Sequence, residues 1–236
     1  MTVETTEIGD GIVRFSTPSP RSIAGVNINQ FLIDAEEPLL FHCGTRSMFP
    51  EVREVLGRLM PLERLRWLSF GHVEADEMGA MNLWLAAAPN TEVLHSPTGC
   101  LLSVDDLADR TPRALPDGGA IELGGRRVRL LETPHVPHNA ESIMLFEEMT
   151  ATLLCGDVGT NGHLRRAVVD DLAEEALAFG GGHPASTALT PDTPRTLRRL
   201  AGLAPRLLAV MHGASFVGDG ATQLEHLAAG YAARMV

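Results

Sequence analysis

The stretch GHVEADEMG places an imidazole and two carboxylates at alternating positions directly after an apolar run. His72, Glu74 and Asp76 are the three side chains, at i, i+2 and i+4. The preceding run RWLSF (66–70) has the pattern of a buried strand, and MGAMNLWLAAAP (78–89) that of a helix ended by proline. The three side chains are therefore expected on a strand-to-helix turn, where chains often carry chemistry.

Three further stretches, PHVPH, CGD and MHG, also place possible metal ligands after strand-like runs. They contribute His135, His138, Asp157 and His212. A sheet would deliver all four stretches to one edge, where open α/β sheets tend to bind ligands. Unpaired buried carboxylates are costly, so such a group of histidines and carboxylates needs cations. Together the stretches favour a metal site.

Each stretch taken alone has a simpler interpretation. Asp76 fits the N-cap of the following helix, and Asp157 fits a residue that caps a turn. His212 fits an interior histidine bonded to the backbone. Short motifs of this kind occur freely by chance, so the metal interpretation depends on the four stretches occurring together.

The order HxExD, H, D and HG resembles the metallo-β-lactamase superfamily, especially its flavodiiron, oxygen-binding di-iron branch. The hydrolytic branches usually carry HxHxDH, with histidine where Glu74 stands. The resemblance runs from FLIDAEEPLLFHCG to MHG. It implies an α/β fold, the four-layer αββα sandwich of metallo-β-lactamase type, formed by residues 1–236 as a single domain.

The resemblance also implies a ligand set for two metal ions. One ion would be bound by His72, Glu74 and a histidine of PHVPH, the second by Asp76 and His212, with Asp157 bridging both. In PHVPH we favour His138, because HNAES runs without a gap into the next strand as the family's HWPDS does. Aligning HVP with HWP would choose His135 instead.

Three departures from the family pattern affect these expectations. Glu77 stands where the family often has a histidine that binds the second ion. Glu77 is therefore either a further metal ligand or a residue beside the ligands, and the same two alternatives hold for His135. His42 stands where the first motif usually has a structural aspartate. The chain ends 24 residues after His212, so we expect no flavodoxin domain and no FMN.

The donor types indicate which metal the site would prefer. Three histidines and three carboxylates place three negative charges against two divalent cations, or four if Glu77 binds. Imidazole-rich sites with an open water suit zinc hydrolysis, whereas added oxygen ligands shift the preference toward iron or manganese. Glu74 in place of histidine therefore favours two iron ions, with zinc or manganese as alternatives.

Two functions from different classes follow. The first is a non-haem di-iron protein that binds or reduces oxygen or nitric oxide, with electrons from an external donor such as a flavoprotein. The second is a binuclear hydrolase that acts on an ester, thioester, amide or phosphoester through a metal-bridging water. A metal-bound sensor or interaction domain without turnover is a third interpretation.

Composition excludes several other classes. The 236 residues are 44% hydrophobic, enough for a globular core, and the net charge of −11 argues against nucleic acid or an anionic membrane surface as partner. Apolar runs are far shorter than the ~18 residues of a membrane span. The polar start MTVETTEIGDG is not a signal peptide, and three scattered cysteines indicate a reducing compartment. We therefore expect a cytoplasmic protein.

Strand-like and helix-like segments alternate along the chain. Strands are expected at 11–16, 25–34, 39–42, 66–70, 92–96, 120–124, 126–133, 142–148, 152–156 and 207–212. Helices are expected at 47–59, 79–88, 168–179, 192–202 and 220–234. The turn PDGG (116–119) separates two halves of similar element order. Met78 and Met81 could face a dry pocket beside the ligands, but the core face of their helix is the favoured interpretation.

The remaining histidines carry weaker signals. His163 and His183 lie on Gly-rich loops, where they could line a pocket, although solvated loop positions are favoured. His95 and His226 have no such context and are interpreted as structural. The run GGG (180–182) has no P-loop Lys or Ser after it and is not a nucleotide signature.

Overall fold

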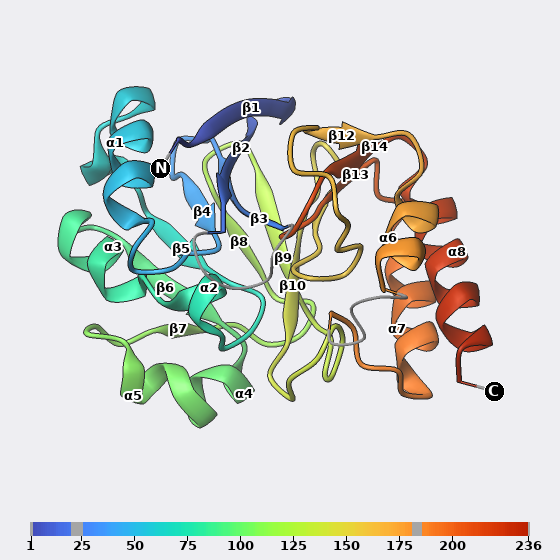
Figure 1. The fold of residues 1–236 in the computed structure, drawn as a ribbon. Helices are drawn as coiled ribbons and strands as arrows, with labels where there is room; N and C mark the ends of the chain where they lie inside the picture. Colours follow the sequence, from blue (N-terminus) through green and yellow to red (C-terminus); the bar gives the residue numbers. More distant parts are fainter. Residues whose placement is uncertain (1, 20–25, 181–185, 236) are drawn as a thin grey trace.

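Two β-sheets lie face to face between two layers of helices (Figure 1). The computed structural model describes residues 2–19, 26–180 and 186–235. Helices α1 and α3 cover one sheet, and α6, α7 and α8 cover the other. The predicted αββα sandwich is therefore confirmed.

The first sheet has seven strands in the order of the sequence. They are β1 (Glu4–Gly9), β2 (Ile12–Pro18), β3 (Asn27–Ile33), β4 (Leu39–Phe41), β5 (Trp67–Ser69), β6 (Glu92–His95) and β7 (Arg113–Ala114). Strands β1 to β4 are antiparallel, and β4 to β7 are parallel. The parallel part needs crossover connections, and helices supply them.

The second sheet also has seven strands, with crossovers. Its spatial order is β12 (Val168–Val169), β14 (Ser215–Val217), β13 (Leu207–Ala209), β11 (Thr152–Leu154), β10 (Ile143–Glu147), β9 (Arg127–Glu132) and β8 (Ala120–Glu122). Strands β8 to β11 form an antiparallel meander, and β13 is parallel to β11. The turn at 116–119 lies between the last strand of the first sheet and the first strand of the second.

The helices differ in length, and the longest, α8, begins at a side-chain cap. The main ones are α1 (Phe49–Leu59), α3 (Met81–Ala87), α6 (Leu172–Gly180), α7 (Asp192–Ala201) and α8 (Gly220–Ala233). Shorter ones are the 3-10 turn Leu62–Arg64, α2 (Ala75–Met78), α4 (Pro97–Gly99), a π-helical turn (Cys100–Val104) and α5 (Asp105–Leu107). Helix α8 starts where the Asp219 carboxylate accepts from the Thr222 N–H, an N-cap.

Three hydrophobic cores separate the four layers, and strand alternation assigns residues to them. In β3, Phe31 and Ile33 pack between the two sheets, whereas Leu32 points to the helices α1 and α3. The same alternation places Leu40 of β4 in the outer core. Successive side chains of a strand point to opposite faces, so covered strands are apolar on both sides. A third core, which includes Leu227, joins the second sheet to α6, α7 and α8.

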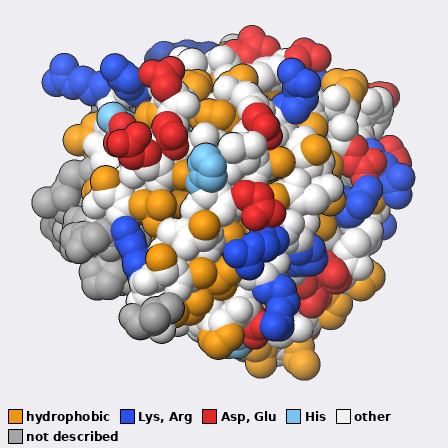
Figure 2. Space-filling view, turned by 90° about the vertical axis from the view of Figure 1, so that its right-hand side faces the viewer, with side chains coloured by type: hydrophobic (Ala, Val, Ile, Leu, Met, Phe, Trp, Pro, Cys, Tyr) orange, Lys and Arg blue, Asp and Glu red, His pale blue; other side chains and the backbone are white. Residues whose placement is uncertain are grey.

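The outer face of these last helices is solvated. Figure 2, in which the right-hand side of Figure 1 faces the viewer, shows acidic and basic side chains interspersed over this face, typical of a solvent-exposed surface. No helix in the described part of the chain is both long and apolar enough to cross a bilayer.

Every predicted strand and main helix is present, with ends shifted by a few residues. One helix was placed too early: residues 168–169 form β12, which pairs with β14, and the helix begins at Leu172. The sequence did not predict the edge strand β1, the short strands β7, β12 and β14, or the helical segment 97–107. These elements are short or polar, so their local periodicity is weak.

Candidate metal centre

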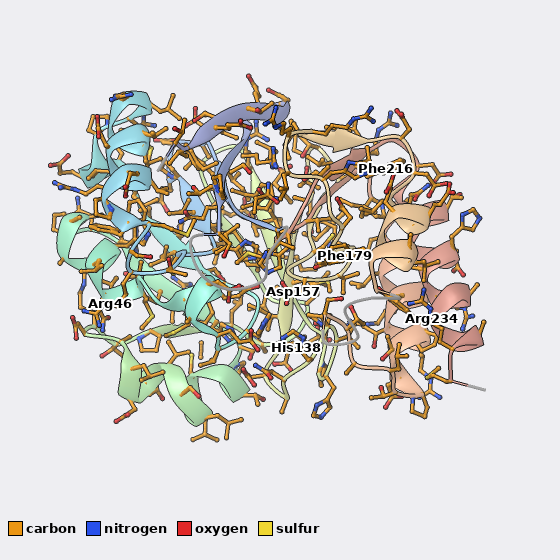
Figure 3. The ribbon with its side chains drawn as sticks, viewed as in Figure 1. Arg46, His138, Asp157, Phe179, Phe216 and Arg234 are labelled. Atoms are coloured by element: carbon orange, nitrogen blue, oxygen red, sulfur yellow. The ribbon has the colours of Figure 1, made fainter. Side chains whose placement is uncertain are left out.

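The two sheets bring the four sequence stretches to one edge. Strands β9 and β11 are both antiparallel to β10, and β13 is parallel to β11, so all three end at the same edge. The loop after β5 of the first sheet faces them, where Ile143 N–H donates to the Gly71 carbonyl at 2.8 Å. Figure 3 shows His138 and Asp157 at this junction between the two halves.

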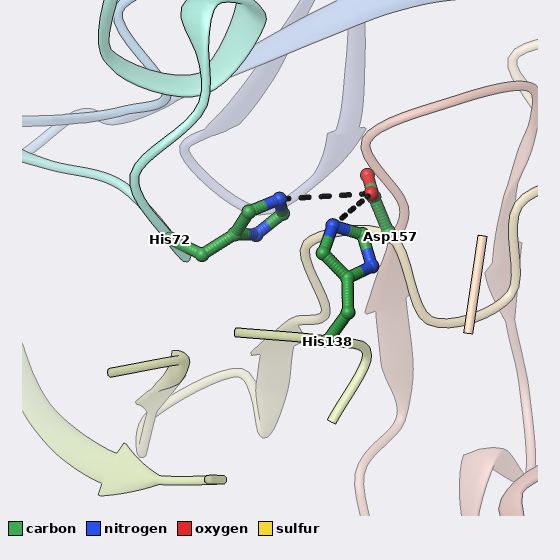
Figure 4. Close-up of side chains that lie close together, drawn as sticks. All are labelled: His72, His138 and Asp157. Carbon is green, nitrogen blue, oxygen red and sulfur yellow. Dashed lines mark ion pairs between the residues drawn. The ribbon is translucent and has the colours of Figure 1, made fainter. Parts of the chain in front are cut away.

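Asp157 lies at the centre of the cluster. Its Oδ2 atom is 3.8 Å from His72 Nε2 and 3.7 Å from His138 Nε2 (Figure 4). Ligand atoms of these three residues all lie within 4.8 Å of one another, which is room for one metal ion. The two imidazole rings meet edge to face, with centroids 4.4 Å apart.

Glu74 adds a second carboxylate to the same group. Its Oε1 is 3.1 Å from His138 Nε2, and its Oε2 is 3.6 Å from His72 Nε2. These contacts to His138 and His72 hold the pKa of the Glu74 carboxyl well below its ordinary value. The Glu74 side chain is 44% exposed, so it is the most solvent-accessible of these side chains.

The other oxygen of Asp157 faces a second group. Oδ1 is 3.3 Å from His212 Nε2, and Asp76 Oδ2 is 3.4 Å from that same nitrogen. Asp76 lies inside α2, whose N-cap is Glu74, so the N-cap interpretation of Asp76 is wrong. One carboxylate therefore presents an oxygen to each of two sets of histidine and carboxylate donors.

The donor atoms fit metal cations. His72 Nε2 and Asp157 Oδ1 are buried and have no hydrogen-bond partner among the described residues. Buried polar atoms are nearly always paired, so two such atoms at the centre of a histidine and carboxylate cluster call for cations.

The charges of the cluster also favour bound metal cations. Burial lowers the pKa of His72, but the carboxylates of Glu77, Glu74 and Asp157 outweigh it and raise that pKa to about 9. Burial also lowers the pKa of His212, which Asp157 raises well above its ordinary value. Burial raises the pKa of Asp157, and His212 with its neighbours lowers it overall. The carboxylates thus draw positive charge onto the imidazoles, a charge that bound cations would supply instead.

Strand β3 positions His212. The Nδ1–H of His212 donates to the Asn27 carbonyl at 2.8 Å, which directs Nε2 toward Asp157. The Asn27 side chain accepts from the Gly213 N–H at 2.7 Å. Gly213 has φ 94°, and a Cβ there would lie 2.3 Å from the Asn161 carbonyl oxygen, so the glycine of MHG is required.

The sequence did not predict that β3 supports the loop of His212. Asn27 and Asn29 lie on one face of β3, and the Asn29 amide donates to the carbonyls of Val210 and Gly213, both at 2.8 Å. Arg14 also donates to the Gly213 carbonyl, at 3.2 Å. The available signal was the pair of asparagines at i and i+2 at the start of a buried strand.

Glu77 lies behind His72. It is buried, its Oε2 accepts from the Gly71 N–H at 2.5 Å, and its Oε1 is 3.5 Å from His72 Nδ1. His42 is also buried, with Nε2 3.4 Å from Glu77 Oε2. Burial raises the pKa of Glu77 to about 8 and lowers that of His42 to about 3.

Other predicted candidates lie away from the cluster. His135 is exposed, whereas His138 turns toward Glu74. His163 pairs with Glu175 at 2.9 Å, and His183 lies outside the described residues. Met78 and Met81 pack in the core between the first sheet and its helices, as favoured.

With this fold and geometry, the chain belongs to the ODP family of beta-lactamases, whose model matches residues 26–213. The predicted resemblance to the flavodiiron branch of the metallo-β-lactamase superfamily is confirmed. A rubredoxin-oxygen oxidoreductase from Megalodesulfovibrio gigas is 22% identical over 202 residues, 82% of this chain and 50% of that protein.

Solved structures share the fold. Rubredoxin oxygen:oxidoreductase from Desulfovibrio gigas has a TM-score of 0.76 at 18% identity, covering 97% of this chain and 60% of its own. A flavodiiron core from Synechocystis sp. PCC6803 has a TM-score of 0.80 at 17% identity, and the match covers 98% of this chain and 61% of that chain. A flavodiiron protein from Giardia intestinalis has a TM-score of 0.80 at 16% identity, and the match covers 98% of this chain and 60% of that protein. The chain thus spans about half the length of the curated relative and about 60% of these solved chains.

Proposed function

We propose that the chain holds a pair of iron ions and reduces oxygen or nitric oxide with electrons from an external donor. The observation that carries this proposal is the Asp157 carboxylate, whose Oδ2 faces His72 and His138 while its Oδ1 faces His212. Such a carboxylate suits a bridge between two ions. Relatives named as oxygen oxidoreductases and flavodiiron proteins support the same chemistry.

The residues divide into two ligand groups in this proposal. His72, Glu74 and His138 hold one ion, Asp76 and His212 hold the second, and Asp157 holds both. Of the two histidines of PHVPH, the geometry supports His138, because its Nε2 lies beside Glu74 while His135 is exposed.

The carboxylates decide which metal is favoured. Glu74 places an oxygen donor beside two imidazoles, where the hydrolytic pattern has a third histidine, and oxygen donors favour iron or manganese over zinc. Bound ferrous iron would supply electrons to oxygen or nitric oxide. Three carboxylates would partly offset the higher charge of the ferric ions that form. Glu74 is also the ligand most accessible to solvent, with a side chain that is 44% exposed.

The test begins with elemental analysis of protein purified without added metal, followed by anaerobic loading with ferrous iron. We expect two iron ions per chain and a change in absorbance when the ferrous protein meets oxygenated buffer in a stopped-flow instrument. The Asp157→Asn variant is the control and should show little of this change, because a neutral amide is a poor bridging ligand.

A donor completes the test. The iron-loaded protein should not turn over with NADH alone and should cycle when a flavoprotein that accepts electrons from NADH is added. Native zinc, no absorbance change with oxygen and measurable hydrolysis of a simple ester would reject the proposal in favour of the hydrolase.

A further inference from the structure

Glu77 is a fully buried carboxylate at the base of the candidate metal centre. Its oxygens have three polar neighbours: Gly71 N–H at 2.5 Å, His42 Nε2 at 3.4 Å and His72 Nδ1 at 3.5 Å. Gly71 leaves room for this carboxylate, since a Cβ at that position would lie 3.2 Å from both oxygens. The chain therefore holds Glu77 against the loop that carries His72.

The orientation of His72 shows which side of the ring Glu77 occupies. Nε2 of His72 faces Asp157 and Glu74, and Nδ1 faces Glu77. The two nitrogens of an imidazole point to opposite sides of the ring, so an ion bound at Nε2 lies away from Glu77. A histidine that binds metal through one nitrogen commonly donates its other N–H to a carboxylate, which fixes the ring.

Three buried atoms without partners converge here. Among the described residues, His72 Nδ1, Glu77 Oε1 and His42 Nε2 have no hydrogen-bond partner. His72 Nδ1 and Glu77 Oε1 face each other, and a movement of a few tenths of an ångström would bring their 3.5 Å separation into hydrogen-bond range. Such a contact would satisfy both atoms at once.

His42 is a rigid support for this carboxylate. Its Nδ1–H donates to the Asn29 carbonyl at 2.9 Å, and its backbone N–H donates to the Ser69 carbonyl at 2.8 Å. The ring packs against Phe41, with centroids 4.3 Å apart. A neutral ring that donates from Nδ1 has no proton on Nε2, so this nitrogen is an acceptor, and it faces Glu77 Oε2 as a partner for the carboxyl O–H. The two positions where the sequence departs from the superfamily pattern are thus in contact.

We propose that Glu77 is a positioning residue that orients His72 through Nδ1, that His42 fixes Glu77, and that Glu77 is not a metal ligand. This inference rests on the proposed metal centre. It has a consequence for affinity. Among the described residues, the first ion has three residues of its own, whereas the second has Asp76 and His212 besides the shared Asp157. The two ions therefore bind unequally, and the first binds more tightly.

The experiment measures cobalt(II) binding to the metal-free full chain by absorbance titration. Wild-type protein should bind two ions in two steps. A His212→Ala background disables the second position and leaves one ion. Adding Glu77→Met to that background removes the carboxylate at similar volume and should weaken the remaining ion roughly 10- to 100-fold.

The conservative variant separates positioning from ligation. Glu77→Gln keeps an oxygen that accepts from His72 Nδ1–H, so in the His212→Ala background it should bind cobalt almost as tightly as Glu77 does. In the otherwise wild-type chain it should retain both ions. If Glu77 ligated the second ion, Glu77→Gln would lose that ion, and Glu77→Met would leave the first ion unchanged.

Glu147 provides the matched control. Glu147 is equally buried and ends β10, away from the cluster. Its carboxylate accepts hydrogen bonds from the Met149 and Thr150 N–H groups. Glu147→Met should lower stability without changing cobalt affinity. A wild-type chain that binds no cobalt would overturn the metal centre and this inference together. Two-step binding by the wild type with no weakening in the Glu77→Met, His212→Ala chain would overturn this inference alone.

Discussion

Asn27 and His212 are 185 residues apart and joined by a hydrogen bond of 2.8 Å from the imidazole Nδ1–H to the Asn27 carbonyl. The contact links β3 of the first sheet to the loop after β13 of the second. The amide side chain of Asn27 holds the adjacent Gly213 N–H. A strand that contributes no candidate ligand therefore determines where a candidate ligand points.

The Asn27→Ala substitution should disturb this loop. It leaves the buried Gly213 N–H without its partner, which costs about 1–3 kcal/mol of unfolding free energy. We also expect weaker binding of the second ion, by roughly 10-fold or more. Urea unfolding and cobalt titration measure the two effects. Asn90→Ala, which removes only an exposed hydrogen bond to the Glu63 carbonyl, is the control and should change neither.

The bridge and the choice of histidine can be tested by metal content. Asp157→Asn should reduce occupancy of both ions, because Asp157 faces both ligand groups. His138→Ala should reduce metal content, whereas His135→Ala should retain it, since the His135 side chain is exposed. Elemental analysis after dialysis measures each variant. Full loading of His138→Ala with loss in His135→Ala would reverse the assignment.

Apolar residues in the outer core of the first sheet should contribute more to the unfolding free energy than exposed apolar residues do. Leu40 is fully buried in that core, so Leu40→Ala should lower the unfolding free energy by about 2–5 kcal/mol. Leu101 is 80% exposed, and Leu101→Ala should change the unfolding free energy by less than about 0.5 kcal/mol. Urea denaturation of the metal-free protein compares the two. Equal losses would contradict the assigned core.

The cysteines should be unreactive in the native state. Cys43, Cys100 and Cys155 are free and buried, and burial raises the pKa of each thiol, to about 11 for Cys100. A raised pKa keeps the thiol protonated at pH 8, so little of the reactive thiolate forms. Iodoacetamide at pH 8 should label the chain slowly when native and fully in urea, as read by mass spectrometry. Rapid native labelling would show that a thiol is accessible.

The sequence predicted the sheets well where both faces of a strand are covered. The run FLI (31–33) is apolar because β3 packs between two cores, and this pattern is visible locally. The start of α6 could not be predicted, because residues 168–169 are strand only through pairing with β14. Edge strand β1 is polar on its exposed face and gave no run of hydrophobic residues.

For the site, residue types and order were sufficient to select the four stretches. They could not decide between His135 and His138, because both follow the same strand and only the path of the loop separates them. The roles of His42 and Glu77 also depend on contacts between distant segments. Spacing along the chain carries no information about such contacts until the two sheets are packed together.

The hydrogen bond between Ile143 N–H and the Gly71 carbonyl joins the two sheets beside the cluster. His72 on one side and His212 on the other are separated by 140 residues of sequence. We expect contacts of such long range to form late in folding, because closing so long a loop costs much entropy. A metal ion bound between the two halves would cross-link them, because the halves could not separate without releasing the ion. Chelation should therefore accelerate unfolding more than it slows refolding.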